Sequence, residues 1–217
     1  MKLELQASHV WKAYGGKPVL KDCSFAFERA GIYVLMGPNG CGKSTFLRLC
    51  ALLERPDRGE INFFSDGRAL RKDIGLIRRI TLVLPKVGVF NTSVAKNAAF
   101  GLRIRGINRA EIDRKINEVL PFVGLMDKKN QPALTLSSGE IQRLGIARAM
   151  VIEPEILFLD EPTASVDEEN TGIIEDIILR MKTGGRSAVV MTTHDKEQAA
   201  RLADCLMVMK DGKLSAG

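Results

Sequence analysis

Several features that would indicate other classes of protein are missing from this sequence. No apolar run approaches the about 20 residues needed to cross a bilayer, and residues 1–10 lack the apolar core of a signal peptide. We therefore expect a cytoplasmic protein that reaches a membrane only through a partner. No internal repeat or low-complexity segment is present. The cysteines form no CxxC pair, which favours reduced, mostly buried thiols over disulfides or a metal site.

What the sequence does contain is ordinary for a globular protein. Its 217 residues are 45% apolar and 27% charged, which suits one sizeable α/β domain. The formal net charge of +6 is compatible with binding polyphosphate, nucleic acid or lipid. The basic residues are spread along the chain, so charge alone does not choose among these partners.

Short apolar stretches alternate with helical patterns. The expected strands lie at 3–10, 24–29, 32–36, 60–64, 80–84, 156–159, 188–192 and 206–209. Expected helices lie at 45–53, from Asn108 onward, from Ser137 to Met150, and from Ile173 to Met181 with an end at Gly184 and Gly185. This alternation predicts a mostly parallel sheet. We expect one domain over 1–217, with an α/β core in 1–87 and 151–217 and an inserted helical lobe at 88–150.

A glycine-rich loop separates the expected strand at 32–36 from the helix that follows it. It reads Gly37, Pro38, Asn39, Gly40, Cys41, Gly42, Lys43, Ser44 and Thr45, which matches GxxxxGK[ST]. Glycines let the backbone wrap a phosphate, while the amides and the helix N-terminus supply partial positive charge. Lys43 can then reach the β- and γ-phosphates, and the Ser44 hydroxyl can bind Mg²⁺. A glycine turn with a chance lysine is the less favoured interpretation.

Two adjacent carboxylates end the apolar stretch at 156–159. A buried strand there would deliver Asp160 to the edge of the sheet, where it can hold Mg²⁺ through water. Glu161 lies one step further and could polarise an attacking water. Alone, the pair could equally be a helix cap and a solvated carboxylate. Beside a phosphate-binding loop, the catalytic interpretation is favoured.

A third motif opens the helix that runs to Met150. Ser137 and Glu140 have the spacing of a capping box, so the motif could be no more than a well-capped helix. Two features favour a further role. Gly139 permits close approach of another group, and Ser137 with the helix dipole could face an anion.

These three motifs and His194 together resemble an ABC-type ATPase, over essentially the whole chain. The resemblance implies the α/β fold of a P-loop NTPase, with a RecA-like, mostly parallel core sheet, an N-terminal antiparallel β subdomain and an inserted α-helical lobe. It implies ATP and Mg²⁺ as cofactors, with Ser44 and Asp160 as metal ligands. It also implies catalytic roles for Lys43, Glu161 and His194.

The resemblance further implies a homodimer in the ATP-bound state, packed head to tail around two ATP molecules. The signature residues of one copy would then contact the ATP of the other: Ser137, Ser138, Gly139 and Glu140. Ser165 and Asp167 would belong to a loop along the dimer interface.

Two single residues gain a role from the same resemblance. His194 is similar to the switch histidine that senses the γ-phosphate, although a lone histidine is usually a surface or core residue. Tyr14 is similar to the aromatic residue that stacks on adenine, and an ordinary core tyrosine is the alternative.

One residue departs from the family pattern. Members usually end the strand before the helical lobe with a glutamine, which touches Mg²⁺ and the attacking water and links the site to the membrane subunits. Here residues 80–84 are followed by Pro85, which has no side-chain oxygen and a fixed φ. Our hypothesis is that a water replaces the missing ligand and that coupling to the lobe is stiffer or weaker. The alternative is that this glutamine chemistry is not needed here.

The resemblance favours a subunit that powers a membrane transporter from the cytoplasmic face, without nucleic acid as a partner. Integral membrane permease subunits are the expected partners, with a periplasmic or extracellular binding protein if the complex imports. A chromosome-structuring ATPase needs a long coiled coil between the motifs, and Thr45 and Leu136 lie too close for one. Translation or repair ATPases usually carry two cassettes or added domains. A weakly hydrolysing nucleotide-binding module, suggested by Pro85, is opposed by the retained catalytic residues.

The sequence says less about the cargo. Residues 89–94 and 98–106 are similar to importers of oxyanions such as tungstate and, more distantly, phosphate. Subunits of lipoprotein release or cell division are also near this size. The expected cargo is therefore an oxyanion, with those two functions as alternatives.

Overall fold

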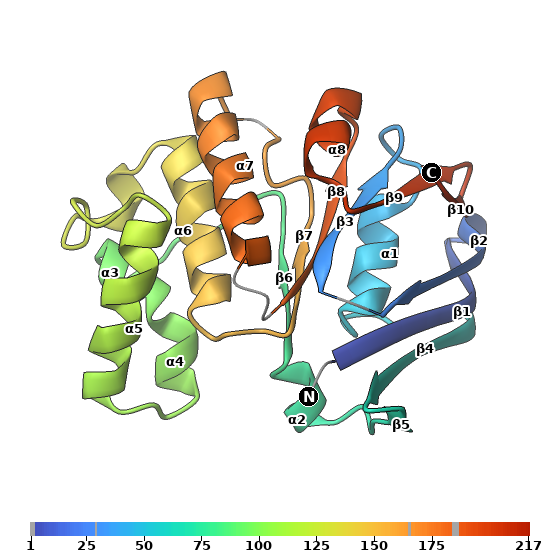
Figure 1. The fold of residues 1–217 in the computed structure, drawn as a ribbon, viewed down its shortest axis with the longest axis horizontal. Coiled ribbons are helices and arrows are strands. Elements are labelled where there is room, and N and C mark those ends of the chain that lie inside the picture. Colours follow the sequence, from blue (N-terminus) through green and yellow to red (C-terminus); the bar gives the residue numbers. More distant parts are fainter. Residues whose placement is uncertain (1–2, 29, 165, 184–186) are drawn as a thin grey trace.

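The computed structural model describes residues 3–28, 30–164, 166–183 and 187–217. Two sheets and a group of helices make up the fold (Figure 1). The antiparallel sheet lies at one end of the view, the helical lobe lies at the other, and the larger sheet runs between them. The described residues include no helix with both the length and the apolar character that a membrane crossing needs.

The smaller sheet is antiparallel and N-terminal, as predicted. Its order is β2 (Lys17–Phe27), β1 (Leu3–Tyr14), β4 (Arg58–Ser65) and β5 (Arg68–Ala69). Strands β1 and β2 are longer than the ranges expected from the sequence. Their register shifts near His9 and Asp22, which have φ of 50° and 59°. These irregularities break the two-residue alternation, so the apolar pattern underestimates both strands.

The larger sheet is mostly parallel. Its order is β10 (Lys213–Ala216), β9 (Cys205–Lys210), β3 (Gly31–Met36), β8 (Ala188–Thr193), β7 (Ile156–Leu159) and β6 (Ile80–Val83). Only β10 runs antiparallel to its neighbour. The carboxyl ends of β3, β8 and β7 therefore lie side by side, where ligands bind in open sheets of this kind.

The helices fall into two groups. The core carries α1 (Lys43–Cys50), α2 (Ile74–Ile77), α7 (Glu168–Thr183) and α8 (Lys196–Leu202). The inserted lobe carries α3 (Val94–Ala98), α4 (Phe100–Ile104), α5 (Arg109–Phe122), a 3₁₀ turn (Ala133–Thr135) and α6 (Ser138–Met150). The Asn108 side chain caps α5 by accepting from the Glu111 N–H, as the spacing predicts.

Several helix bounds differ from the expectation. Helix α1 begins at Lys43 rather than residue 45, and it ends before Leu52, whose φ of 58° leaves the helical region. Helix α8, α2 and strand β5 have no counterpart among the expected elements, because each is too short to give a clear period. The expected stop at Gly184 and Gly185 lies outside the described residues.

The core consists of two apolar clusters, one on each face of the larger sheet. In β3, Ile32 and Val34 belong to the cluster that includes residues of α6, α7 and the lobe. Tyr33 and Leu35 belong to the cluster that includes residues of α1 and the antiparallel sheet. Strands β7 and β8 are buried along their whole length, which explains their continuous apolar character.

Candidate active site

The glycine-rich loop lies between β3 and α1, as predicted. Gly42 precedes the helix with φ of 114°, a conformation that residues with a side chain rarely adopt. A Cβ built on Gly37 would lie 2.3 Å from the carbonyl oxygen of Met209. Both glycines are therefore required by the path of the backbone. Helix α1 begins directly after the loop, so the amides of its first turn have no partner within the helix.

Lys43 is folded back over this loop. Its Nζ donates to the carbonyl oxygens of Gly37 at 2.8 Å and Pro38 at 3.2 Å. The same Nζ lies 3.2 Å from Oε1 of Glu161, and the Lys43 side chain is only 4% exposed. The cation is therefore held at the position where polyphosphate would meet the loop.

Ser44 and Asp160 meet across the sheet edge. The Ser44 hydroxyl donates to Oδ1 of Asp160 at 3.0 Å, and Asp160 is 2% exposed. These oxygen donors fit Mg²⁺, which takes few protein ligands and keeps several waters or substrate oxygens. Among the residues that the structure describes, no cluster of three or more His, Cys, Asp or Glu side chains could hold a metal.

Glu161 and His194 extend the group. The Glu161 side chain is 21% exposed, and Nδ1 of His194 lies 3.8 Å from its Oε2. The His194 ring itself is mostly exposed. Both residues therefore lie at the same sheet edge as Lys43.

Thr192, which the sequence analysis did not single out, lies between these groups. Its hydroxyl donates to Oδ1 of Asp160 at 2.8 Å and accepts from the Glu161 N–H at 2.8 Å. The only sequence signal was a threonine two positions before His194 in an apolar strand.

Tyr14 lies at the end of β1 and is 42% exposed, which excludes the alternative of a core tyrosine. Its hydroxyl donates to Glu54, which also accepts from Arg48 at 2.7 Å. These two bonds hold the pKa of the Glu54 carboxyl below its usual range, and the bond from Tyr14 has the larger effect. Arg48 also reaches the Thr45 hydroxyl at 3.3 Å, so a chain of contacts connects the ring to the phosphate loop.

The signature motif caps α6 as predicted. The Ser137 side chain accepts from the Glu140 N–H, and the Glu140 side chain accepts from the Ser137 N–H. Glu140 also pairs with Lys128. Figure 1 shows α6 and α1 on opposite sides of strands β6, β7, β8 and β3. One chain therefore does not bring its own signature helix to its own phosphate loop.

The expected interface loop is described in part. Ser165 lies outside the described residues. The Asp167 carboxylate accepts from the N–H of Asn170 at 2.8 Å and from its side-chain amide. These bonds lower the pKa of the Asp167 carboxyl, and the bond from the backbone N–H has the larger effect.

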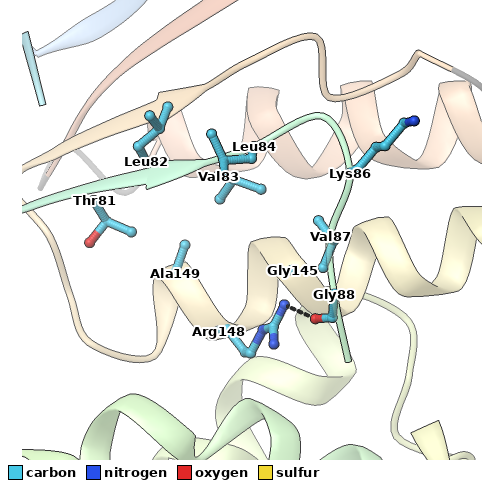
Figure 2. A pocket seen from close by; sticks show the side chains of 10 residues that line it. All are labelled: Thr81, Leu82, Val83, Leu84, Lys86, Val87, Gly88, Gly145, Arg148 and Ala149. Atoms are coloured by element: carbon cyan, nitrogen blue, oxygen red, sulfur yellow. Dashed lines mark hydrogen bonds between the residues drawn. The ribbon is translucent and has the colours of Figure 1, made fainter. Parts of the chain in front are cut away.

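A groove lies between the end of β6 and α6 (Figure 2), and Pro85 lies in the chain between two of its lining residues, Leu84 and Lys86. Its lining residues are Thr81, Leu82, Val83, Leu84, Lys86, Val87, Gly88, Gly145, Arg148 and Ala149. Arg148 donates to the carbonyl oxygen of Gly88 at 2.7 Å, and burial lowers its pKa. A Cβ on Gly145 would lie 2.6 Å from a methyl of Val87. The loop after β6 is thus clamped to α6 at two points.

A phosphate loop between β3 and α1, facing an aspartate and a glutamate at the end of β7, defines a P-loop ATPase. The model of the family described as ABC transporter matches residues 20–164. The chain belongs to the ABC transporter family, as an ATP-binding subunit that hydrolyses ATP.

Individual relatives agree with this assignment. The tungstate uptake system ATP-binding protein TupC of Peptoclostridium acidaminophilum is 34% identical, over 98% of this chain and 97% of the relative. The phosphate import ATP-binding protein PstB 2 of Natronomonas pharaonis is 36% identical, over 97% of this chain and 78% of the relative. The solved structure of cbiO1 from Clostridium perfringens, part of the ABC transporter complex cbiONQ, matches with a TM-score of 0.86. That match has 27% identity and covers 97% of this chain and 86% of the other. It confirms the predicted fold class.

Proposed function

We propose that two copies of this chain close head to tail around two ATP molecules, and that this closure drives a membrane importer. The observation that carries the proposal is the separation of α6 from α1 within one chain (Figure 1). The phosphate loop, Asp160 and Glu161 meet at the ends of β3, β8 and β7, and the capped N-terminus of α6 is not among them. A second copy could supply it, as the signature helix of the partner.

Nucleotide binding would begin at the phosphate loop. The loop amides and the start of α1 attract the phosphates, and Lys43 exchanges the carbonyl oxygens that hold it now for phosphate oxygens. The exposed ring of Tyr14 would stack on adenine. Ser44 and Asp160 would hold Mg²⁺, which when bound supplies positive charge to the β- and γ-phosphate oxygens.

Hydrolysis would then depend on the carboxylate of Glu161. When Lys43 binds phosphate, its ion pair with Glu161 would be lost. The Glu161 carboxylate could then accept a hydrogen bond from water and orient that water for in-line attack. His194 lies close enough to Glu161 to sense the γ-phosphate at the same edge. Lys43 and the partner's signature residues would stabilise the charge that spreads over the transferred phosphoryl group.

The groove beside Pro85 supports docking of a permease. Its lining includes the exposed Leu84 and also Arg148, which contacts the exposed Phe90. The Phe90 and Phe100 rings pack with centroids 4.3 Å apart, and Arg148 lies over Phe90. An apolar surface of this kind, between the core and the lobe, could carry motion of the ATPase to a membrane partner. The chain would then lie on the cytoplasmic face of the membrane.

The proposed cargo is an oxyanion such as tungstate, taken up with the help of a periplasmic or extracellular binding protein. The support is that relatives over nearly the whole chain are named for tungstate and phosphate. The test is uptake of labelled tungstate and phosphate by cells with and without this gene. Loss of tungstate uptake on deletion is expected. Unchanged uptake of both anions, together with a defect in lipoprotein release or division, would replace this cargo with one of those functions.

The dimer is tested with Glu161→Gln. With ATP and Mg²⁺, light scattering should give the mass of two chains for this variant, and its turnover should fall at least about a hundredfold below wild type. The control is Glu197→Gln on α8, whose side chain is 90% exposed. The control should match wild type. A Glu161→Gln variant that stays monomeric with ATP bound contradicts the head-to-tail site.

A weakly hydrolysing module is the second candidate, favoured by Pro85. The same turnover assay separates the two. If wild type turns over ATP no faster than Glu161→Gln even with permease present, the chain is a nucleotide-binding module instead of a motor.

A further inference from the structure

Thr192 occupies the place where the two halves of the candidate site meet. It is the second-last residue of β8, the strand between β3 and β7, and it is 0% exposed. It pairs with Leu35 of β3, while Met191 pairs with Leu159 of β7. Its side chain is therefore next to the first residues after β7, which are Asp160 and Glu161.

The Thr192 hydroxyl is both a hydrogen-bond donor and a hydrogen-bond acceptor. It donates to Oδ1 of Asp160 at 2.8 Å, and it accepts from the Glu161 N–H at 2.8 Å. The same Oδ1 accepts from the Ser44 hydroxyl at 3.0 Å. A hydroxyl has one proton and two lone pairs, so only a residue such as serine or threonine can make both contacts from this position.

The second contact matters because Glu161 has φ of 45°. Residues with a Cβ avoid this left-handed region unless their surroundings hold them there. The bond from its N–H to Thr192 is one such constraint, and it fixes the direction in which the Glu161 side chain leaves the backbone.

We propose that Thr192 is a positioning residue for ATP hydrolysis. One buried hydroxyl sets the orientation of the Asp160 carboxylate and the backbone turn that aims Glu161 toward the phosphates. Thr192 acts through these two neighbours and does not itself touch the nucleotide. The inference rests on the roles proposed above for Asp160 and Glu161.

The test compares variants that separate the hydroxyl from the methyl group. Thr192→Val and Thr192→Ala lose the hydroxyl, whereas Thr192→Ser keeps it. The control is Ser187→Ala, which removes a hydroxyl bond to the Pro154 carbonyl oxygen just before the opposite end of the same strand. For each, we would measure the turnover of ATP, the affinity for ATP with and without Mg²⁺, and the melting temperature.

The expected pattern follows the hydroxyl. Turnover should fall about 10–100-fold in Thr192→Val and Thr192→Ala, as for other groups that orient a metal ligand, and Thr192→Ser should recover most of it. ATP affinity without Mg²⁺ should stay at the wild-type value, because the phosphate loop is intact. The gain in ATP affinity on adding Mg²⁺ should shrink in the two variants without a hydroxyl. Ser187→Ala should match wild type in all of these.

A purely structural role gives a different pattern. The melting temperature would then fall in Thr192→Val or Thr192→Ala while turnover and the Mg²⁺-dependent gain stayed as in wild type, and this would overturn the proposal. If Thr192→Val does not fold, comparing the turnover of Thr192→Ala with that of Thr192→Ser tests the proposal in the same way. Glu161→Gln is measured in parallel. If Glu161→Gln hydrolyses ATP at the wild-type rate, the assignment of Glu161 is wrong. If Glu161→Gln is inactive but Thr192→Val and Thr192→Ala are fully active, only the role of Thr192 is wrong.

Discussion

Asn170 of α7 fills the space that a side chain on Gly139 of α6 would need. A Cβ built on Gly139 would lie 2.2 Å from Cγ of Asn170. The Asn170 amide in turn donates to both carboxylate oxygens of Asp167, at 2.9 and 3.0 Å. The signature helix and the expected interface loop of one chain are thus joined through one short side chain.

We therefore expect Gly139→Ala to strain this contact. It should lower the free energy of unfolding by about 1–3 kcal/mol, as overpacking does, and slow ATP turnover. Urea unfolding measures the first effect. Gly172→Ala, on α7 with no atom within 4 Å of its added Cβ, is the control and should not destabilise. Combining Gly139→Ala with Asn170→Ala should cost less than the sum of the single changes. Strict additivity would show that the two residues are not coupled.

Lys43→Ala should remove most of the affinity for ATP. The lysine is the buried cation at the phosphate loop, and its loss leaves the carboxylate of Glu161 facing the phosphates. Charge-assisted bonds of this kind are worth about 1.5–3 kcal/mol each, so affinity should fall at least about tenfold. Titration with a fluorescent ATP analogue measures it. Lys213→Ala, an exposed lysine on β10, should leave affinity unchanged. If Lys43→Ala and Lys213→Ala bind ATP with equal affinity, Lys43 does not contribute to the binding site.

The sequence predicts the parts of this site that are continuous in the chain. The phosphate loop, the carboxylates after residues 156–159 and the capping box of α6 each lie within a few residues, and all three take the expected local form. Thr192 and Asn170 escape such prediction because their partners are distant in sequence. Their contacts depend on β8 lying between β3 and β7, and on α7 packing against α6.

The strand bounds show the same limit. Period-two alternation predicts where β1 and β2 lie, and the bulges at His9 and Asp22 then hide how far they extend. The buried runs of β7 and β8 are predicted well because both faces of each strand are covered.

Tyr14 offers a test of adenine stacking. Tyr14→Ala should weaken ATP binding by about 1–3 kcal/mol, the usual range for stacking of a base on an aromatic ring. Tyr14→Phe keeps the ring and loses only the bond to Glu54, so its affinity should stay near wild type. Calorimetric titration with ATP and with inorganic triphosphate distinguishes the effect, because triphosphate has no base. An equal loss for both ligands would argue against stacking.

The capping box should give α6 a pH-dependent contribution to stability. Burial raises the pKa of Glu140, but the bonds from Lys128 and from the Ser137 N–H outweigh it, so the pKa lies below the usual value. The stabilisation is therefore complete above the unfolded-state pKa of about 4.3, and it is lost as pH falls through the lower folded-state value. Glu140→Gln should cost about 1–2 kcal/mol at pH 7, with the difference from wild type shrinking below about pH 4. Urea unfolding at both pH values measures this, and a constant difference would contradict it.

A substitution at Pro85 tests whether the loop beside the groove affects ATP hydrolysis. The loop that carries it is clamped to α6 by the Arg148 bond to Gly88 and by Val87 against Gly145 (Figure 2). Pro85→Gln restores a side-chain oxygen and a backbone N–H while leaving both clamps in place. We expect it to raise ATP turnover in the presence of the permease, because the added amide would supply a side-chain oxygen that proline lacks. The measurement is turnover with and without permease in membrane vesicles. If neither the basal rate nor its stimulation changes, the hypothesis of a replacing water with altered coupling is wrong, and the glutamine chemistry is not needed in this chain.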